Sequence, residues 1–179
     1  ADKGKGILRT RDYADVDGMV TDEPGLVLNT FYADCVPLYF VDPIHHAIGL
    51  AHSGWRGTVG RMGERMVETM EAQFGSRPEE LYAAIGPSIC RDCYEVSEDV
   101  AVQFIRMLGD QVATPGKEPG KHQLDLWLAN ELILRQAGLL PSHIAVTDIC
   151  TCHNSQYLFS HRASGGRRGS LAAFLMLKD

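Results

Sequence analysis

The stretch that decides the fold spans residues 33–57 and reads ADCVPLYFVDPIHHAIGLAHSGWRG. Its first part, residues 36–41, is apolar and rich in residues that favour strands. Asp42-Pro43 is typical of a turn, and residues 47–51 form a second β-prone run. The pattern predicts a β-hairpin, with polar and potentially reactive residues at its open end.

The expected hairpin brings a cysteine and a histidine together. A symmetric turn centred between Pro43 and Ile44 would set Cys35 directly opposite His52. Cross-strand partners have Cβ atoms roughly 5 Å apart. A thiol and an imidazole at that distance can share a soft metal such as zinc, or form an activated thiolate pair. The alternative is a buried core thiol beside a histidine that only ends a strand.

The residues after the hairpin favour a functional site over that structural alternative. Residues 53–57, Ser-Gly-Trp-Arg-Gly, place two glycines and Arg56 between a strand and an expected helix. Such a turn offers free backbone N–H groups and a guanidinium to an anion. We therefore expect a metal or thiolate pair next to an anion-binding turn.

Length and patterning indicate one domain spanning residues 1–179. A hydrophobic fraction of 45% and a charged fraction of 22% are typical of globular proteins. Helices and strands are expected in similar amounts, with at least one antiparallel pair. The predicted class is α+β, with mixed sheets layered against helices. Expected helices cover residues 58–74, 97–108 and 124–137, expected strands cover 25–30, 81–85, 145–149 and 171–177, and 109–121 is expected to be a loop.

Charge and cysteine content narrow the range of partners. A net charge of −6 argues against a nucleic-acid-binding surface and favours small-molecule substrates. No apolar run reaches the roughly 18 residues of a membrane span, and no signal peptide is evident. Five cysteines, an odd number, fit a reducing compartment, so we expect a cytoplasmic protein.

Two further cysteine pairs raise the question of a zinc knuckle. Cys90 and Cys93 form one pair, Cys150 and Cys152 the other, and together they supply four thiolates. Structural zinc sites usually bring their pairs together within a short loop, whereas 56 residues separate Cys93 from Cys150. This spacing disfavours the knuckle. His153 and His161 flank the strand end at Cys150, so either could approach a metal, although most lone histidines do not bind one.

A basic, glycine-rich loop precedes the last expected strand. Residues 160–169 read SHRASGGRRG, and the guanidinium groups of Arg162 and Arg167 suit a phosphate. The alternative is a solvated loop with no ligand.

Four motifs in one order carry a family resemblance. They are Ala33-Asp34-Cys35-Val36-Pro37, Ala51-His52-Ser53-Gly54-Trp55-Arg56-Gly57, Ile85-Gly86-Pro87-Ser88-Ile89 and Phe159-Ser160-His161-Arg162. Together they resemble the YfiH/YlmD family of laccase-domain, or multicopper polyphenol oxidase, proteins, closest to the bacterial YlmD type. The resemblance implies an α/β/β/α arrangement of two mixed sheets between helices, related to the fold of bacterial toxin cysteine hydrolases.

The resemblance also implies a zinc site made by one cysteine and two histidines. By motif, the cysteine is Cys35 and one histidine is His52. The second histidine of the family lies in an upstream Gln-Val-His-Gly segment that this sequence does not contain. We expect the chain to be a single domain of this type that lacks an N-terminal segment of the family.

The resemblance implies either of two activities. One is copper-dependent polyphenol oxidation. The other is phosphorolysis of purine nucleosides (adenosine, inosine, guanosine and methylthioadenosine) together with deamination of adenosine. A laccase needs several copper ions and roughly ten paired histidines, and this sequence has seven histidines.

We therefore expect a zinc enzyme with glycosyl-transfer and hydrolase chemistry. Cys35 and His52 would be metal ligands and catalytic. Asp34 would orient His52 or a ribose hydroxyl, and Arg56, Arg162 and Arg167 would hold inorganic phosphate. A metal-free Cys/His hydrolase acting in peptidoglycan editing is the remaining enzymatic alternative, and a non-catalytic module that binds a phosphorylated ligand is the third.

Overall fold

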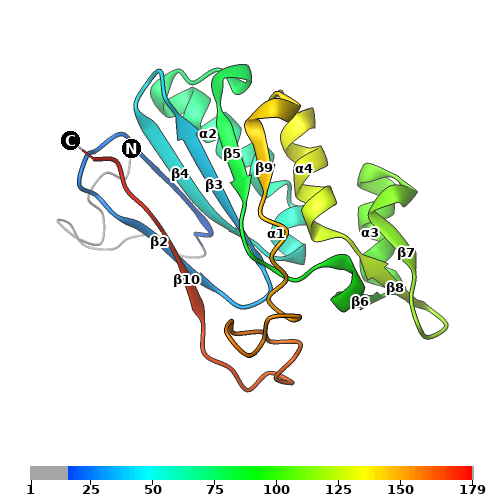
Figure 1. Cartoon of the computed structure of the whole chain (residues 1–179). Helices are drawn as coiled ribbons and strands as arrows, with labels where there is room; N and C mark the ends of the chain where they lie inside the picture. The colour runs from blue at the N-terminus through cyan, green and yellow to red at the C-terminus, as the bar shows by residue number, and fades with distance from the viewer. Residues whose placement is uncertain (1–15, 179) are drawn as a thin grey trace.

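A computed structural model describes residues 16–178, and its centre is a five-stranded mixed sheet (Figure 1). The strand order is β1-β4-β3-β5-β9, and only the β5–β9 pair is parallel. The strands are β1 (Gly18–Thr21), β3 (Val36–Asp42), β4 (Ala47–Ser53), β5 (Tyr82–Ile85) and β9 (Ile144–Val146). β3 is apolar and fully buried at most positions because layers cover both faces of this sheet.

The predicted β3–β4 hairpin is confirmed, but its predicted register is wrong by two residues. Asp42 pairs with Ala47, and Pro37 pairs with His52. The turn is longer than expected because the Asp42 side chain builds it: Oδ1 accepts from the backbone N–H groups of Ile44 and His45, each at 2.9 Å.

The shift of two residues keeps the predicted residues on one face of the sheet. Side chains alternate along a strand, so only an odd shift would have reversed them. Continuing the observed register places Cys35 opposite Gly54, with His52 as its diagonal neighbour. The predicted direct pairing is therefore wrong, but Cys35 and His52 remain diagonal neighbours on one face of the hairpin.

Helices cover one face of the sheet and bury the main core. They are α1 (Trp55–Val59), α2 (Met62–Phe74) and α4 (Leu126–Gln136). The single helix expected over 58–74 is interrupted, because Arg61 has a left-handed φ of 57° between α1 and α2. The fully buried core between the helices and the sheet includes Leu38, Phe40, Met70, Ile85 and Ile133.

A two-stranded sheet covers the opposite face. β2 (Leu28–Tyr32) pairs antiparallel with β10 (Leu171–Leu175). Leu28, Tyr32 and Ala173 from this sheet bury Ile48 and Leu50 of β4. The order of layers is helices, five-stranded sheet and two-stranded sheet, which confirms the expected α+β class.

A smaller sheet lies beside the main one (Figure 1). Its order is β6-β8-β7, with β6 (Glu95–Ser97), β7 (Ala113–Pro115), β8 (Lys121–Leu124) and the adjoining helix α3 (Glu98–Leu108). The loop expected over 109–121 is therefore partly wrong, because β7 forms within it. Short 3-10 turns complete the elements: η1 (Pro78–Glu80), η2 (Arg91–Cys93), η3 (Asp110–Val112) and η4 (Pro141–His143). None of the helices between residues 16 and 178 is long and apolar enough to span a membrane.

Candidate metal and anion site

The open end of the β3–β4 hairpin brings Cys35 and His52 together over a glycine. Gly54 is the N-cap of α1, and a Cβ placed on it would lie 3.0 Å from Cys35 Sγ and 3.9 Å from His52 Nε2. Both donor atoms therefore border the same small space. A side chain at position 54 would fill that space, so glycine keeps it open.

The two ring nitrogens of His52 have different surroundings. Nδ1 lies 3.3 Å from Oδ1 of Asp17. Nε2 is buried and has no hydrogen-bond partner among residues 16–178. With the proton on Nδ1, shared with Asp17, Nε2 directs its lone pair towards the space beside Cys35. A metal-binding histidine typically has this arrangement, with a carboxylate on the nitrogen that does not bind the metal. The residues present thus fit a metal ion.

The surroundings of Cys35 do not favour its thiolate form. Burial raises its pKa, and the carboxylate of Asp34 raises it further. A metal-free nucleophilic cysteine needs a lowered pKa, because the thiolate is the reactive form. The surroundings of Cys35 are those of a thiol that ionises when a cation joins it.

Among residues 16–178, Asp34 makes no hydrogen bond to His52, so of its two predicted roles the one at a ribose hydroxyl stays a prediction. Its backbone has a left-handed φ of 79°, and its buried carboxylate accepts from Thr151 Oγ1 at 2.6 Å and from the backbone N–H of Arg162 at 2.7 Å. The carboxylate at His52 is that of Asp17 instead. Asp34 joins the start of β3 to the long segment between β9 and β10, drawn from yellow to orange-red in Figure 1.

This junction predicts a stability loss for Asp34→Asn. Asparagine tolerates the left-handed backbone, but it removes the negative charge, and its NH₂ group must face either the Arg162 N–H, which only donates, or a Thr151 hydroxyl that has turned round to accept. We expect the free energy of unfolding to fall by about 1–3 kcal/mol. Urea denaturation measures it, with Asp110→Asn at an exposed position as the matched control. A change of less than about 0.5 kcal/mol for Asp34→Asn would show that the junction is not needed.

Arg162 joins two segments of the chain by hydrogen bonds and is also a candidate anion ligand. Its guanidinium donates to the carbonyl of Cys93 at 3.0 Å and to that of Glu95 at 2.9 Å, and it lies 5.4 Å from the ring centroid of Tyr94. Arg162 therefore ties the start of the basic loop to η2 and β6, while the side chains of residues 161–170 are exposed.

Tyr94 is a residue that the sequence analysis missed. Burial raises its pKa to about 12, and the charged groups that act on it include Cys35, Arg162 and Arg56. Tyr94 thus responds to the charges of the thiol and of two predicted phosphate ligands, and it is in contact with one of them, Arg162. Its position directly after the Cys90–Cys93 segment was the only signal in the sequence.

The other predicted arginines are exposed. Arg56 lies over the ring of Trp55, with 4.3 Å between Cζ and the ring centroid. Arg167 lines a shallow hollow in the 155–169 segment, together with Arg168. Arg168, which was not predicted, is near enough to Cys35 for its charge to lower the pKa of that thiol against the effect of burial. Arg162 contacts Tyr94, and the charge of Arg56 also acts on that tyrosine, whereas no contact joins Arg167 to Cys35 among the described residues.

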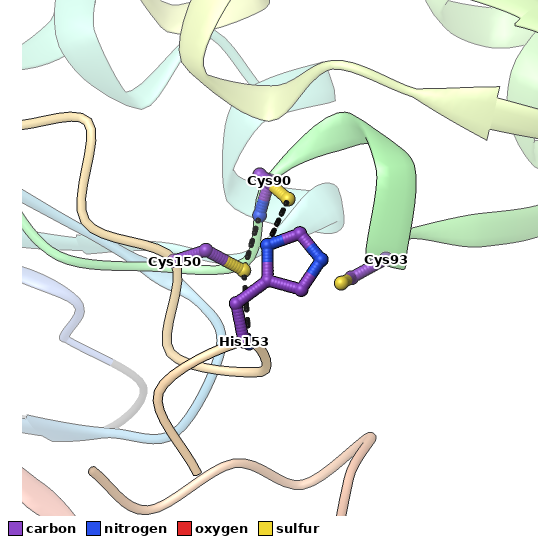
Figure 2. A group of neighbouring side chains, drawn as sticks. All are labelled: Cys90, Cys93, Cys150 and His153. Atoms are coloured by element: carbon purple, nitrogen blue, oxygen red, sulfur yellow. Dashed lines mark hydrogen bonds between the residues drawn. The ribbon is translucent and has the colours of Figure 1, made fainter. Parts of the chain in front are cut away.

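The two cysteine pairs meet despite the distance between them in sequence. Cys90, Cys93, Cys150 and His153 place their donor atoms within 4.8 Å of one another, a set that can bind a metal (Figure 2). The prediction that the spacing disfavours a knuckle is therefore wrong, because the fold brings residues distant in sequence together. The fourth donor of the group is His153 and not Cys152, as the two cysteine pairs had suggested.

Comparison with known proteins decides the family. The model of the family described as multi-copper polyphenol oxidoreductase laccase matches residues 2–178. The chain belongs to this family. The YfiH/YlmD resemblance carried by the four motifs is thereby confirmed.

Curated relatives of this chain carry other names than that of the family. The purine nucleoside phosphorylase YlmD of Bacillus subtilis (strain 168) is 38% identical over 184 residues, which covers 99% of this chain and 65% of that protein. An adenosine deaminase, RL5, from an unknown prokaryotic organism is 37% identical over 158 residues, covering 86% of this chain and 59% of the relative.

The fold of the laccase family is confirmed by a solved structure. YlmD from Geobacillus stearothermophilus superposes with a TM-score of 0.87 at 39% sequence identity. The match covers 92% of this chain and 62% of that one. The chain thus spans about two thirds of the length of the relatives it matches.

Proposed function

We propose that the protein is a zinc-dependent purine nucleoside phosphorylase that also deaminates adenosine. The observation that carries the proposal is the unpartnered Nε2 of His52 beside the Cys35 thiol, with Arg56 and Arg162 nearby. The names of the relatives support the same reading, since one is called a purine nucleoside phosphorylase and another an adenosine deaminase.

Cys35 and His52 would hold the zinc ion together with the upstream histidine that the family resemblance implies. When bound, zinc supplies a Lewis acid and lowers the pKa of a coordinated water molecule. Asp17, 3.3 Å from Nδ1, would hold the His52 proton on that nitrogen and leave Nε2 free for the ion. Cys35 releases its proton on binding, against the effect of burial. Gly54 leaves the space beside both donors clear for substrate.

The arginines would hold inorganic phosphate for attack on the sugar carbon. Arg162 spends two N–H groups on backbone carbonyls and still has others to donate, so its position is fixed before phosphate binds. Arg56 extends from the N-terminal turn of α1 and adds a second guanidinium. Arg167 belongs to the same proposal as a ligand at the edge of the loop.

The geometry gives less support to copper-dependent polyphenol oxidation. All seven histidines fall within the described residues, and these contain no group of three or more histidines close enough to share metal ions. A multicopper centre needs several imidazoles together. The metal-free Cys/His hydrolase is disfavoured by the raised pKa of Cys35. Zinc with one thiolate and imidazole nitrogen is the better match to the donors.

The proposal is tested by incubating the protein with adenosine or inosine, with and without phosphate, and separating the products. Release of free base that requires phosphate, and of inosine from adenosine without it, is the expected result. Both should be lost with a chelator and return with zinc. Release of neither product from zinc-loaded protein would overturn the proposal, and oxidation of a phenol only by copper-loaded protein would favour the oxidase.

Arg162→Lys separates anchoring from charge. Lysine keeps the positive charge but cannot donate to two carbonyls in a fixed fork, so we expect the KM for phosphate to rise about tenfold while the KM for nucleoside changes little. Initial rates at varied phosphate measure this. Arg106→Lys, on the exposed side of α3, is the matched control and should leave both values unchanged. An unchanged phosphate KM for Arg162→Lys would remove this residue from the phosphate site.

A further inference from the structure

We propose that Cys90, Cys93, Cys150 and His153 form a second zinc site, separate from the Cys35/His52 pair, whose role is structural. Figure 2 shows the imidazole of His153 among the three sulfur atoms. The distance from Cys90 Sγ to His153 Nδ1 is 3.7 Å, and no two donor atoms of the group are more than 4.8 Å apart. Ligands of a tetrahedral zinc ion with Zn–S bonds of about 2.3 Å lie roughly 3.8 Å from one another. Small side-chain movements would complete the tetrahedron.

The surroundings of Cys150 favour a bound thiolate over an ordinary core thiol. Cys150 is buried, and its sulfur accepts from the backbone N–H groups of Cys90 and His153, each at 3.4 Å. Backbone N–H groups directed at sulfur stabilise negative charge and are common around metal-bound thiolates. A neutral thiol does not need two N–H donors, whereas a thiolate bound to a metal ion is stabilised by them.

The fold assembles the site through backbone pairing, not through the spacing of the cysteines. An isolated parallel bridge joins Ser88 to Cys150, beyond the ends of β5 and β9. The N–H of Ser88 donates to the carbonyl of Ile149, and the N–H of Thr151 donates to that of Ser88. The segment after β5 thus brings Cys90 and Cys93, and the segment after β9 brings Cys150 and His153, to the same point.

The site is closed on the protein side and open on the other. Cys90 and Cys93 are half-buried, whereas His153 is exposed. The hollow at the group is lined by Asp92, Asp125 and Asp148 and by Arg91, which lies 4.0 Å from Asp125, so three carboxylates face one guanidinium. These carboxylates would attract a divalent cation towards the exposed ligand, which gives the ion a route in.

Binding would exchange three S–H bonds for three Zn–S bonds. The three protons pass to solvent, and His153 adds a neutral nitrogen, so the site would carry a net charge of −1. A full set of four protein ligands leaves no position for water or substrate, as in structural zinc sites. Because the carbonyl of Cys93 accepts from Arg162, the ion would also stiffen the segment that anchors the basic loop.

Metal content of variants tests the second site. We expect Cys35→Ser/His52→Ala protein to retain one tightly bound zinc ion per chain, and Cys90→Ser/Cys150→Ser protein to lose one relative to wild type. The second variant should also unfold at a lower temperature. If the wild type holds a single ion that disappears only with Cys90→Ser/Cys150→Ser, the second site stands and the proposed catalytic zinc falls. Zinc content unaffected by Cys90→Ser/Cys150→Ser would overturn the second site.

A matched pair of single variants tests the ligand set and avoids the buried cysteine. His153→Ala changes an exposed side chain and should weaken zinc retention against a chelator about 10–100-fold or more. Cys152→Ser, one residue away, should retain the metal. The opposite result, with Cys152→Ser losing zinc and His153→Ala keeping it, would refute this set of four ligands. Cobalt added to metal-stripped wild type gives an independent reading, because three thiolates produce strong sulfur-to-cobalt charge-transfer absorption.

Discussion

Replacing Cys35 by serine is expected to lower kcat/KM for phosphorolysis of inosine by about 10²–10³-fold, the range for loss of a principal electrostatic group. Serine keeps the size of the side chain but does not supply a thiolate to zinc. The free energy of unfolding should change little, because Cys35 is only partly buried at the end of β3. Steady-state rates and zinc content, measured on the same preparation, check both parts.

Comparison with His52→Ala shows whether the two residues act as a unit. Ligands of one ion are not additive, so Cys35→Ser/His52→Ala should be little worse than either single variant. His46→Asn, at the exposed hairpin turn with a left-handed φ of 51°, is the control histidine and should keep full activity. Full activity in Cys35→Ser protein, or effects of the two single changes that multiply, would contradict a shared metal ion.

Asp42→Asn is expected to have the largest effect on stability, lowering the free energy of unfolding by about 2–4 kcal/mol at pH 7. The Asp42 carboxylate is buried and accepts from the backbone N–H groups of Ile44 and His45 and from His45 Nδ1 at 2.8 Å. Asparagine can keep both backbone N–H groups on its single oxygen, but it loses the negative charge that all three donors stabilise and turns an NH₂ group towards His45 Nδ1. Because this turn sets the register that brings Cys35 beside His52, zinc binding should weaken as well.

The same residue predicts an acid-dependent loss of stability. Burial works against ionisation of Asp42, but the nearby Ser76 hydroxyl and the hydrogen bonds from His45 and Ile44 outweigh it and hold the pKa below its ordinary value of 3.8. A lowered folded-state pKa gives stability that is fully present above the unfolded-state pKa and is lost as the pH falls through the folded value. Wild type should therefore lose stability below about pH 4, and Asp42→Asn should lose less over the same range. Parallel stability curves for the two proteins between about pH 5 and 2 would contradict this role.

The strands of the central hairpin could be read from the sequence, but their register could not. The apolar runs of β3 and β4 and the Asp42-Pro43 turn signal sufficed to locate the strands. Register depends on how many residues the turn contains, and here the Asp42 side chain extends it to four. The break between α1 and α2 was missed for a similar reason, since apolar spacing does not reveal the left-handed conformation at Arg61.

The candidate site was predictable where its residues are close in sequence. Cys35, His52 and Arg56 follow from one hairpin and the turn after it. The partnership of Asp34 with Thr151 and the approach of Cys150 to Cys90 depend on the pairing of β5 with β9, which the composition of neither strand specifies. Tyr94 could be linked to the site only from the structure, in which Arg162 binds the carbonyls of Cys93 and Glu95 on either side of it.

Anomalous diffraction at the zinc edge, from crystals of the zinc-loaded protein, tests the central claim most directly. A peak about 2.3 Å from Cys35 Sγ and about 2.0 Å from His52 Nε2, with Nδ1 still on Asp17, is the predicted result. A zinc-loaded crystal with no peak there, or with the Cys35 sulfur turned away from His52, would contradict it.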